Sequence, residues 1–400
     1  MNILLVIGKF EVGGIISVVD NLSKELIKKG HKVIIFGAED RRKEFPFKEM
    51  FNGSKVKKAS FPILTKKRWL EDLSLILRSF WVFRRLIGKQ KIDLIAFNHS
   101  HSALGIMLSR SSWNIPKVFH FHGAWDIEER NTIKNDLSLF KRLKINTRLF
   151  FYKKAEGFVL RKSSLIIVLS QKSKELLLSH FKHLGCKRIE IIPSGIEIKK
   201  SKSFVSKEDL CFSSKVPLIF SLGRFDKKKG LDYLLKAASI LNKKNIDFKM
   251  VIAGPVSDWQ YCNDLFSLYE DLRLEGKVHF LHKLSFQEKE RFFKVSDFLV
   301  VPSTGFEAYP VTIMEALFYG LPVIATRVGG IPDMLLDLDK RFLVTPKNSL
   351  ALAEKIEWFL DLSKKERKKI SEKCINYAQK NFSLKKSCHD VLSIYNSVVE

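Results

Sequence analysis

Short apolar runs rich in β-branched residues alternate along the chain with longer segments whose apolar residues recur at helical spacing. In the first half these runs are NILLVI, HKVIIFG, IDLIAFN, PKVFHFHG, SSLIIVLS and RIEIIPSG. Between the first two runs, the apolar residues of segment 15–29 share one helical face, which predicts a helix there. A repeated order of strand, helix and strand predicts a parallel sheet with helices on both faces.

The same pattern restarts in the second half, after a polar stretch rich in serine and lysine. Its apolar runs are VPLIFSLG, DFKMVIAGP, KVHFLHK, DFLVVPS and LPVIATRVGG, and helical spacing dominates from residue 348 onward. We therefore predict an α/β protein in which two Rossmann-like, doubly wound domains face each other across a cleft. The expected boundaries are a first domain over 1–195, a linker over 196–215, a second domain over 216–375 and a C-terminal helix over 376–400 that crosses back to the first domain.

The composition is that of a globular protein, because 46% of the 400 residues are hydrophobic. No run approaches the ~18 apolar residues of a membrane-spanning helix. The first run, Ile3 to Ile7, is too short for the core of a secretory signal and is better explained as a strand. Five cysteines are scattered without a close pair, which predicts neither a zinc site nor a disulfide framework and fits a reducing cytoplasm.

The positive charge lies mostly in the first half of the chain. The net charge is +27, and residues 1–195 carry 37 Lys and Arg against 17 Asp and Glu, whereas residues 196–400 carry 33 against 26. A one-sided positive field indicates an acidic partner such as nucleic acid, anionic lipid or a phosphorylated acceptor. The alternative is a lysine-rich surface without a partner, produced by a general bias toward lysine. Such a bias would raise the positive charge of both halves equally.

Segment 55–91 concentrates this charge, with eleven Lys and Arg, two acidic residues and several aromatic residues between them. A basic helix that carries aromatic residues is typical of an element that lies on a membrane surface. An ordinary domain helix with its aromatic face in the core explains the pattern equally well. On the first interpretation, the membrane or acceptor surface includes Lys66, Lys67, Arg68, Trp69, Arg84 and Arg85.

Several residues suited to ligand binding follow predicted strands, where parallel sheets bind their ligands. Gly14 is the last residue of the loop GKFEVGG. Its glycines let the backbone approach a ligand closely, and the amides at the start of the following helix are suited to an anion. The glycine spacing is not that of a dinucleotide-binding fingerprint.

His120 and His122 point the same way in an alternating strand. His122, which precedes Gly123 at the strand end, can bind a sugar hydroxyl, and a structural histidine is the alternative; a metal pair is disfavoured because no third ligand lies at a familiar spacing. Arg224 and Lys229 can hold a diphosphate from two sides, one as a fork and one as a point charge.

Two glutamates flank a predicted helix start in GFEAYPVTIMEALFYGLPVIATRVGGIPD. Glu307 lies in the loop after a strand, and Glu315 lies one turn inside a helix expected over 311–319. Pro310 fits the first turn of that helix, since its missing N–H is not needed there, and Gly320 ends the helix.

The start of this helix is also suited to an anion. The amides of Val311 and Thr312 have no partner within the helix, and they lie at the positive end of its dipole. We expect them to bind a phosphate, while one carboxylate suits vicinal hydroxyls and the other a second set of hydroxyls.

This stretch resembles the retaining GT-B glycosyltransferases of family 4, also called group 1. Their mark is two glutamates with seven residues between them, followed by a run that here reads GLPVIATRVGGIPD. The pairs and runs GG at 13–14, HG at 122–123, PSGIE at 193–197, GR at 223–224 and KKG at 228–230 occur in the family's order. The resemblance covers most of the chain and is strongest over about 216–360. Ala308, Tyr309 and Pro310 depart from the glycine-rich run that the family often has after its first glutamate, which blurs the identity of the donor sugar.

The resemblance implies transfer of a sugar from a nucleotide-diphosphate donor with retention at the anomeric carbon, and it implies neither a metal nor another cofactor. It assigns catalytic roles at the donor sugar to Glu307 and His122, and ribose binding to Glu315. It also implies that the donor diphosphate is bound by Gly14, Arg224, Lys229, Val311 and Thr312.

Together, these features predict a glycosyltransferase of bacterial cell-surface polysaccharide or lipopolysaccharide synthesis that acts on a saccharide or lipid-linked acceptor. We expect it in the cytoplasm, peripheral at the inner face of the cell membrane, with an anionic membrane surface and no nucleic acid as partner. A sugar-nucleotide epimerase of the same fold is the alternative function. A basic nucleic-acid-binding protein is a more distant one, since it would leave the two glutamates unused.

Overall fold

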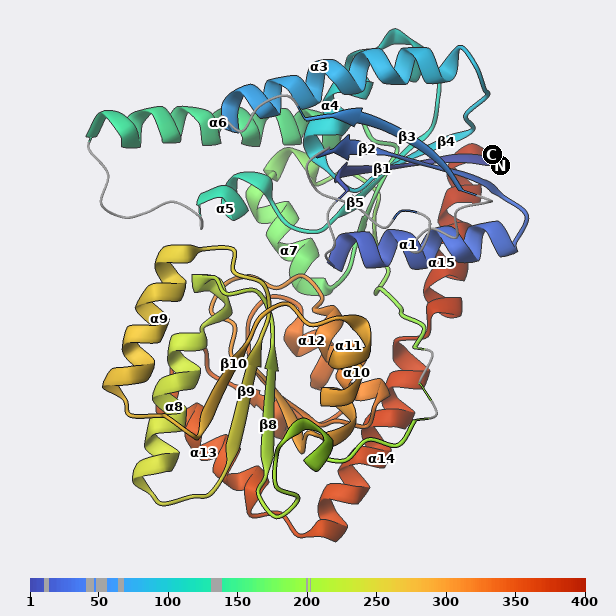
Figure 1. The fold of residues 1–400 in the computed structure, drawn as a ribbon. Coiled ribbons are helices and arrows are strands. Elements are labelled where there is room, and N and C mark those ends of the chain that lie inside the picture. The colour runs from blue at the N-terminus through green and yellow to red at the C-terminus, as the bar shows by residue number, and fades with distance from the viewer. Residues whose placement is uncertain are drawn as a thin grey trace. The chain divides into compact units, whose positions relative to one another are not determined.

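The structure is a computed structural model that describes residues 1–10, 14–40, 47, 56–63, 68–130, 139–198, 201 and 203–400. Contacts within the chain divide it into two compact units, drawn in Figure 1. Unit 1 comprises Met1–Gly195 and Leu384–Glu400, and unit 2 comprises Ile196–Ser383. Each unit contains one sheet in which the described strand pairs are parallel, so the predicted doubly wound α/β architecture is confirmed.

The seven strands described in unit 1 follow the order β3-β2-β1-β4-β5-β6-β7. This order reverses direction between β1 and β4, and such a switch point is where open parallel sheets bind ligands, just beyond the carboxyl ends of the strands. The strands are β1 (Asn2–Lys9), β2 (Lys32–Glu39), β3 (Val56–Pro62), β4 (Leu94–Phe97), β5 (Lys117–Phe121), β6 (Leu165–Val168) and β7 (Ile189–Ile191).

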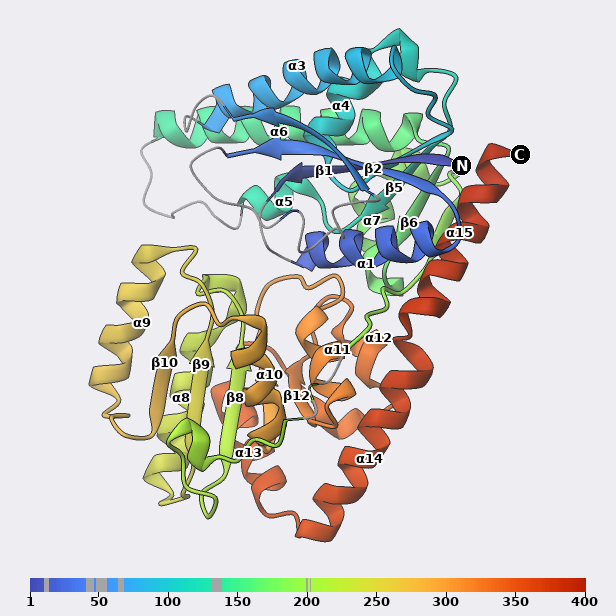
Figure 2. The ribbon, with the colours of Figure 1, turned by 45° about the vertical axis from the view of Figure 1, so that its right-hand side comes forward.

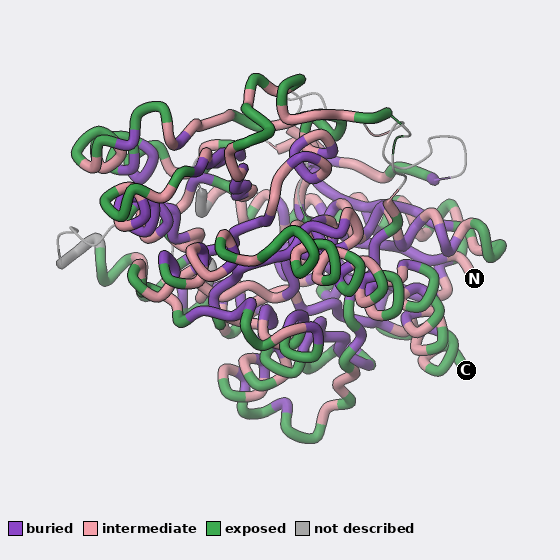
Figure 3. Tube along the Cα trace, turned by 90° about the horizontal axis from the view of Figure 1, so that it is seen from below, coloured by how far each residue is buried: buried purple, intermediate pink, exposed green. Residues whose placement is uncertain are grey.

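Alternation along β1 explains why helices cover both faces of this sheet. Leu4 and Val6 join a core with α3, α4, α6 and α7, whereas Ile3 and Leu5 join a core with α1 and α15. Figure 2 shows α15 alongside α1, and in Figure 3 the exposed residues follow the outer turns of the helices. The helices are α1 (Gly14–Lys28), α3 (Arg68–Ile87), α4 (Ser100–Leu108), α5 (Trp125–Arg130), α6 (Leu139–Lys162), α7 (Gln171–His180) and α15 (Leu384–Val399).

The six strands described in unit 2 follow the order β10-β9-β8-β11-β12-β13, with the reversal between β8 and β11. Helices α8, α9 and α13 share one core with the sheet, while Phe220 turns to the other face and stacks on Phe292 of α10. The strands are β8 (Leu218–Leu222), β9 (Lys249–Ala253), β10 (Val278–Leu281), β11 (Phe298–Val301), β12 (Val323–Thr326) and β13 (Leu343–Val344). The helices are α8 (Leu231–Lys243), α9 (Trp259–Asp271), α10 (Phe286–Val295), α11 (Val311–Phe318), α12 (Ile331–Leu335), α13 (Ser349–Leu360) and α14 (Lys364–Asn381).

The C-terminal segment differs from the single helix expected over 376–400. Helix α14 ends at Asn381 and α15 begins at Leu384, so the division between units falls at 383 and 384. Phe382 is 1% exposed and packs against Tyr377, while its carbonyl accepts from the amide of Ile196 at 3.0 Å. Ile196 also forms a parallel bridge with Ser383, so the backbone at 382–383 pairs with residue 196 where the two helices are interrupted.

All five cysteines are free, and the described residues contain no cluster of three or more His, Cys, Asp or Glu that could hold a metal ion. Of the helices described, none has both the length and the apolar character needed to cross a membrane.

Candidate functional site

The loops that follow β8 and β11 in unit 2 are bonded to each other. The amides of Thr304 and Gly305 donate to the carbonyl of Lys228 at 2.8 and 3.0 Å. Gly230, at φ +64°, lies so close to the second loop that a Cβ there would meet the carbonyl oxygen of Pro302 at 2.3 Å. Two loops from distant parts of the sequence are thus held in one arrangement at the sheet's switch point.

An ion pair joins the side chains of these loops. The Lys229 ammonium lies 2.6 Å from Oε1 of Glu307, and the hydroxyl of Ser303 donates to the same oxygen at 2.9 Å. Both charged side chains are largely buried, being 20% and 12% exposed, and the stem of Lys229 lies over Gly223. Burial acts to raise the pKa of Glu307, but Lys229, Lys228 and Ser303 hold that pKa below its ordinary value. Glu307 is therefore an ionised carboxylate whose charge is already matched.

The VGG run after β12 fixes the backbone of Glu307. The amide of Gly330 donates to the carbonyl of Glu307 at 2.7 Å. Gly329 adopts φ +53°, and a Cβ there would lie 2.1 Å from that same carbonyl oxygen. Only glycine suits both this backbone conformation and this approach, which gives the glycine pair of the motif a physical reason.

Helix α11 begins directly beyond this loop. Pro310 is its N-cap, with ψ 118°, and not a residue of its first turn as expected, because the extended ψ keeps Pro310 outside the helix. Val311 and Thr312 are the first helical residues, so their amides have no acceptor within the helix. Gly320, at φ +77°, follows the end of the helix as predicted.

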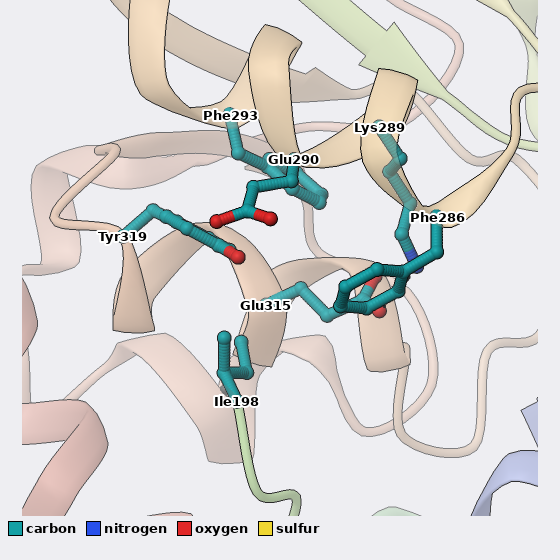
Figure 4. A pocket seen from close by; sticks show the side chains of 7 residues that line it. All are labelled: Ile198, Phe286, Lys289, Glu290, Phe293, Glu315 and Tyr319. Carbon is teal, nitrogen blue, oxygen red and sulfur yellow. Dashed lines mark hydrogen bonds and ion pairs between the residues drawn. The ribbon is translucent and has the colours of Figure 1, made fainter. Parts of the chain in front are cut away.

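The second glutamate is paired as well. Glu315 lies 2.5 Å from the ammonium of Lys289, which projects from the first half of α10. Figure 4 shows these two side chains pointing toward one another, with the ring of Phe286 beside them. They line a small pocket together with Ile198, Glu290, Phe293 and Tyr319. No sequence motif indicated Lys289, because only the packing of α10 against α11 brings it to Glu315.

Arg224 follows β8 directly, on the same loop as Lys229. Its side chain is 52% exposed, and its Nε lies 3.4 Å from the carboxylate of Asp226. The guanidinium is therefore engaged by an acid of its own loop, while Lys229 alone of the two predicted cations contacts Glu307.

In unit 1, His122 follows β5 and pairs with a residue that follows β4. Nε2 of His122 donates to Oδ1 of Asn98 at 3.2 Å, since an amide oxygen can only accept. Burial lowers the pKa of His122 to about 4, so the imidazole is neutral at neutral pH. With the proton on Nε2, the Nδ1 atom carries the lone pair and can accept a hydrogen bond. Asn98 has no sequence signal of its own, and it became identifiable only through this contact.

His120 has a different partner, although alternation places both histidines on the same face of the strand. Its Nε2 lies 2.8 Å from the hydroxyl of Tyr395 in α15, and burial lowers its pKa to about 3. His120 thus has a structural role, because it attaches the C-terminal helix to the sheet.

Gly14 is the first residue of α1 and is exposed. It begins a helix that follows β1, at the switch point of the sheet of unit 1, which is the position expected for an anion-binding backbone. The neighbouring residues 11–13 lie outside the described part of the chain.

The predicted membrane or acceptor residues are only partly described. Arg84 and Arg85 are exposed in the last turn of α3. Lys66 and Lys67 lie outside the described residues, as do the side chains of the two residues that begin α3, Arg68 and Trp69.

Two family models match the chain in tandem. One, described as Glycosyltransferase Family 4, matches residues 12–200, and the other, described as Glycosyl transferases group 1, matches residues 204–381. An uncharacterized glycosyltransferase of Methanocaldococcus jannaschii is 27% identical over 97% of this chain and 95% of its own. The alpha-monoglucosyldiacylglycerol synthase of Streptococcus pneumoniae is 26% identical over 79% of this chain and 68% of its own. The UDP-Gal:alpha-D-GlcNAc-diphosphoundecaprenol alpha-1,3-galactosyltransferase of Escherichia coli is 27% identical over 65% and 64%.

Solved structures agree on the fold. A glycosyltransferase from Rickettsia africae superimposes with a TM-score of 0.74 at 24% identity, covering 100% of this chain and 98% of that one. HepE from Anabaena, solved in complex with UDP and glucose, superimposes with a TM-score of 0.76 at 18% identity, covering 99% and 100%. The chain is a glycosyltransferase with the GT-B fold.

These comparisons do not favour the epimerase alternative. Within this glycosyltransferase, the structure brings together Lys229 and Glu307, and it places Arg224, Val311 and Thr312 on the loops and helix next to them. Three contributions were missed by sequence reasoning: Ser303 at Glu307, Lys289 at Glu315 and Asn98 at His122.

We expect Gly329→Ala to disable this glycosyltransferase, because the new methyl group must displace the carbonyl of Glu307. Gly276→Ala is the matched control, since Gly276 also has a positive φ of +71° but has nothing within 4 Å of the added Cβ. Both substitutions should cost roughly 1–2 kcal/mol in backbone strain. Only Gly329→Ala should lower kcat/KM for the donor, at least about tenfold, as measured by nucleotide release. Equal activity in the two variants would show that the close approach is not needed.

We also expect the free energy of unfolding to fall as the pH drops from 6.5 toward 4. The folded pKa values of His120 and His122 lie near 3 and 4, below the ordinary 6.5, so in this window the unfolded chain binds protons that the folded chain does not. Above about pH 7.5, where both histidines are neutral in the folded and the unfolded chain, these two groups contribute no pH dependence. Denaturant titration of the wild type and of His120→Gln across pH 7 to 4 measures the effect, and the variant should show the shallower decline. Identical slopes would contradict the burial of a neutral His120.

Proposed function

We propose that this glycosyltransferase transfers a sugar from a nucleotide-diphosphate donor to a saccharide or lipid-linked acceptor, with retention at the anomeric carbon. The observation that supports this proposal most directly is the buried ion pair of Lys229 and Glu307 at the switch point of unit 2. A cation and an anion held 2.6 Å apart there can each be engaged by one part of a nucleotide sugar, the ammonium by the diphosphate and the carboxylate by sugar hydroxyls.

The surrounding groups support this assignment. Arg224 is mostly exposed and tethered by a single 3.4 Å contact, so its guanidinium can turn to a second phosphate oxygen. The first amides of α11 add an anion-binding helix end. Together with Lys229 they would stabilise the negative charge that develops on the leaving diphosphate. A phosphate oxygen of that leaving group is then the base that takes the acceptor proton on the same face of the sugar.

The second ion pair supports a site for the donor's ribose. Glu315 lies on α11 and faces a pocket that Phe286 and Lys289 border, so its carboxylate can accept from the vicinal hydroxyls of the ribose. Lys289 then balances the carboxylate in the absence of the donor. In unit 1, the acceptor nitrogen of the neutral His122 is suited to a hydroxyl of the donor sugar.

The names of the relatives support the acceptor class. The S. pneumoniae relative is named for a glycolipid, and the E. coli relative for a diphosphoundecaprenol-linked sugar. We infer a role in cell-surface polysaccharide or lipopolysaccharide synthesis, carried out in the cytoplasm with the enzyme peripheral at the inner face of the membrane. The excess of 37 basic over 17 acidic residues in the first half of the chain fits an anionic surface as partner.

Lys229→Ala and Glu307→Gln should each lower kcat/KM by about 10- to 150-fold. One hydrogen bond to a charged group is worth roughly 1.5–3 kcal/mol, which corresponds to that range. Nucleotide release from a panel of nucleotide sugars, with and without a membrane extract as acceptor, first identifies the donor and then provides the rates. The anomeric configuration of the isolated product, measured by NMR, tests retention.

Lys277→Ala is the matched control, because Lys277 pairs with Asp247 at 2.8 Å in the same unit on an exposed surface. Its activity should equal that of the wild type, and melting temperatures should show that all variants fold. Full turnover in Lys229→Ala or Glu307→Gln with the identified donor would overturn the proposal. Turnover of the donor without an acceptor into an epimerised sugar nucleotide would instead favour the epimerase.

We further propose that transfer needs no metal ion, since Lys229, Arg224 and the amides of α11 supply the positive charge that the diphosphate requires. Activity after treatment with EDTA and gel filtration should therefore remain within about twofold of the untreated enzyme. Loss of activity with EDTA that is restored by Mg²⁺ or Mn²⁺ would contradict this.

A further inference from the structure

The outward face of α3 is apolar. Leu73, Leu77 and Trp81 are 47%, 52% and 59% exposed, and their spacing of four residues places them in one stripe along the helix. The opposite side of α3 supplies buried residues such as Leu75 and Phe83 to the core of unit 1. The sequence alternatives for this segment were a helix on a membrane surface and a domain helix with its aromatic face in the core. The structure places Phe83 in the core and Trp81 at the surface.

Helix α6 adds a second exposed apolar stripe. Leu143, Phe150 and Phe151 are 65%, 57% and 63% exposed. The two helices touch, because the hydroxyl of Tyr152 in α6 donates to the carboxylate of Asp72 in α3. Figures 1 and 2 both show α3 and α6 along the same edge of unit 1. Sequence reasoning missed α6, since its buried and exposed apolar residues taken together are spread around the helix, so that the exposed stripe does not stand out in the sequence.

The acidic residues of both helices are turned inward. The only acid in the sequence of α6, Glu156, is 1% exposed and accepts from the hydroxyl of Ser100 and the amide of Trp125. In α3, Asp72 is bonded to Tyr152 and Glu71 is paired with Lys9. Negative charge on these helices is therefore used within the unit and does not offset the cations at its surface.

The basic residues, by contrast, border the apolar stripes. Arg84 and Arg85 continue the stripe of α3, and the guanidinium of Arg84 lies 5.8 Å from the ring of Trp81. On α6, Lys144 and Lys154 are exposed, and the ammonium of Lys154 lies 5.4 Å from the ring of Phe150. Exposed aromatic and aliphatic side chains bordered by cations are the pattern of helices that lie at a charged lipid interface.

We propose that the exposed side chains of α3 and α6 form one docking face for an anionic phospholipid bilayer. This α3–α6 face consists of Leu73, Leu77, Trp81, Leu143, Phe150 and Phe151, with the bordering cations. This inference rests on the membrane association proposed above, and it adds which surface of the protein contacts the membrane. A second copy of the chain fits the face poorly, because a net charge of +27 makes like surfaces repel.

Co-sedimentation of the full-length protein with vesicles tests the face. Vesicles of phosphatidylcholine alone are compared with vesicles that contain phosphatidylglycerol, at low and high salt. The wild type should bind the anionic vesicles at least tenfold more tightly, and high salt should weaken that binding. The double variants Trp81→Ser/Phe151→Ser and Arg84→Glu/Arg85→Glu should each lose at least tenfold in partitioning, since one cation contributes about fivefold.

Trp259→Ser is the matched control, because Trp259 is 71% exposed on α9 of unit 2 and lies outside the face. It should pellet like the wild type, and melting temperatures confirm folding of all variants. Equal pelleting of the wild type with neutral and anionic vesicles would overturn the proposal. So would pelleting of both face variants at the wild-type level, or a change of oligomeric state in a face variant measured by light scattering, which would assign the face to a second copy.

Failure of this inference is separable from failure of the proposed function. Lys229→Ala should lose transfer but pellet like the wild type, because Lys229 lies in unit 2 at the carboxyl end of β8. Transfer that depends on Lys229 with no vesicle binding would leave the enzyme assignment standing and refute the face alone.

Discussion

The buried ion pair of Lys229 and Glu307 is the interaction on which the functional site depends. It joins residues 78 positions apart and lies where two loops are already bonded through the carbonyl of Lys228. A buried charge without a partner is costly, so each side chain fixes the other. The glycine pair at 329 and 330 then holds the backbone of Glu307 from the other side. The carboxylate is thus ionised and positioned before any ligand arrives.

A second balance of charges arises in the same way around Glu315. Lys289 approaches it from α10, and the two border a small pocket that is also lined by Ile198, Glu290 and three aromatic rings (Figure 4). Each acid of the motif is therefore matched by a lysine from a different element. A ligand that carries both phosphates and hydroxyls can take the place of these internal partners, because phosphates can bind the ammonium groups and hydroxyls can donate to the carboxylates.

Unit 1 uses its charges differently. The acidic side chains of α3 and α6 form contacts inside the unit, such as that of Asp72 with Tyr152. Arginine and lysine side chains of these helices lie at the surface beside exposed rings. The cations that border the stripes, such as Arg84 and Lys154, are therefore exposed, and the inward-facing acids help to hold the helices together. The same separation gives unit 1 an outer face that is apolar and cationic at once.

Much of the fold was predictable because local patterns determine it. Alternating apolar runs indicated the parallel sheets, and the helix over 15–29 is observed as Gly14–Lys28. The helix expected over 311–319 is observed as Val311–Phe318, and only the role of Pro310 differed, since sequence does not reveal whether ψ is extended. The break between α14 and α15 was missed because it depends on Phe382, whose burial and bond to Ile196 join residues that are distant in the chain.

By itself, the sequence determined the two-sheet architecture, the order of the strand-end residues and the presence of two glutamates flanking a helix start. These follow from periodicity and from turn residues, which act within a few positions of the chain. Only the tertiary structure decided which lysine meets which glutamate, that Asn98 orients His122 while Tyr395 engages His120, and that α6 exposes its aromatic residues. Such contacts depend on how separate elements pack, and no local pattern encodes the distance between side chains that lie tens or hundreds of residues apart.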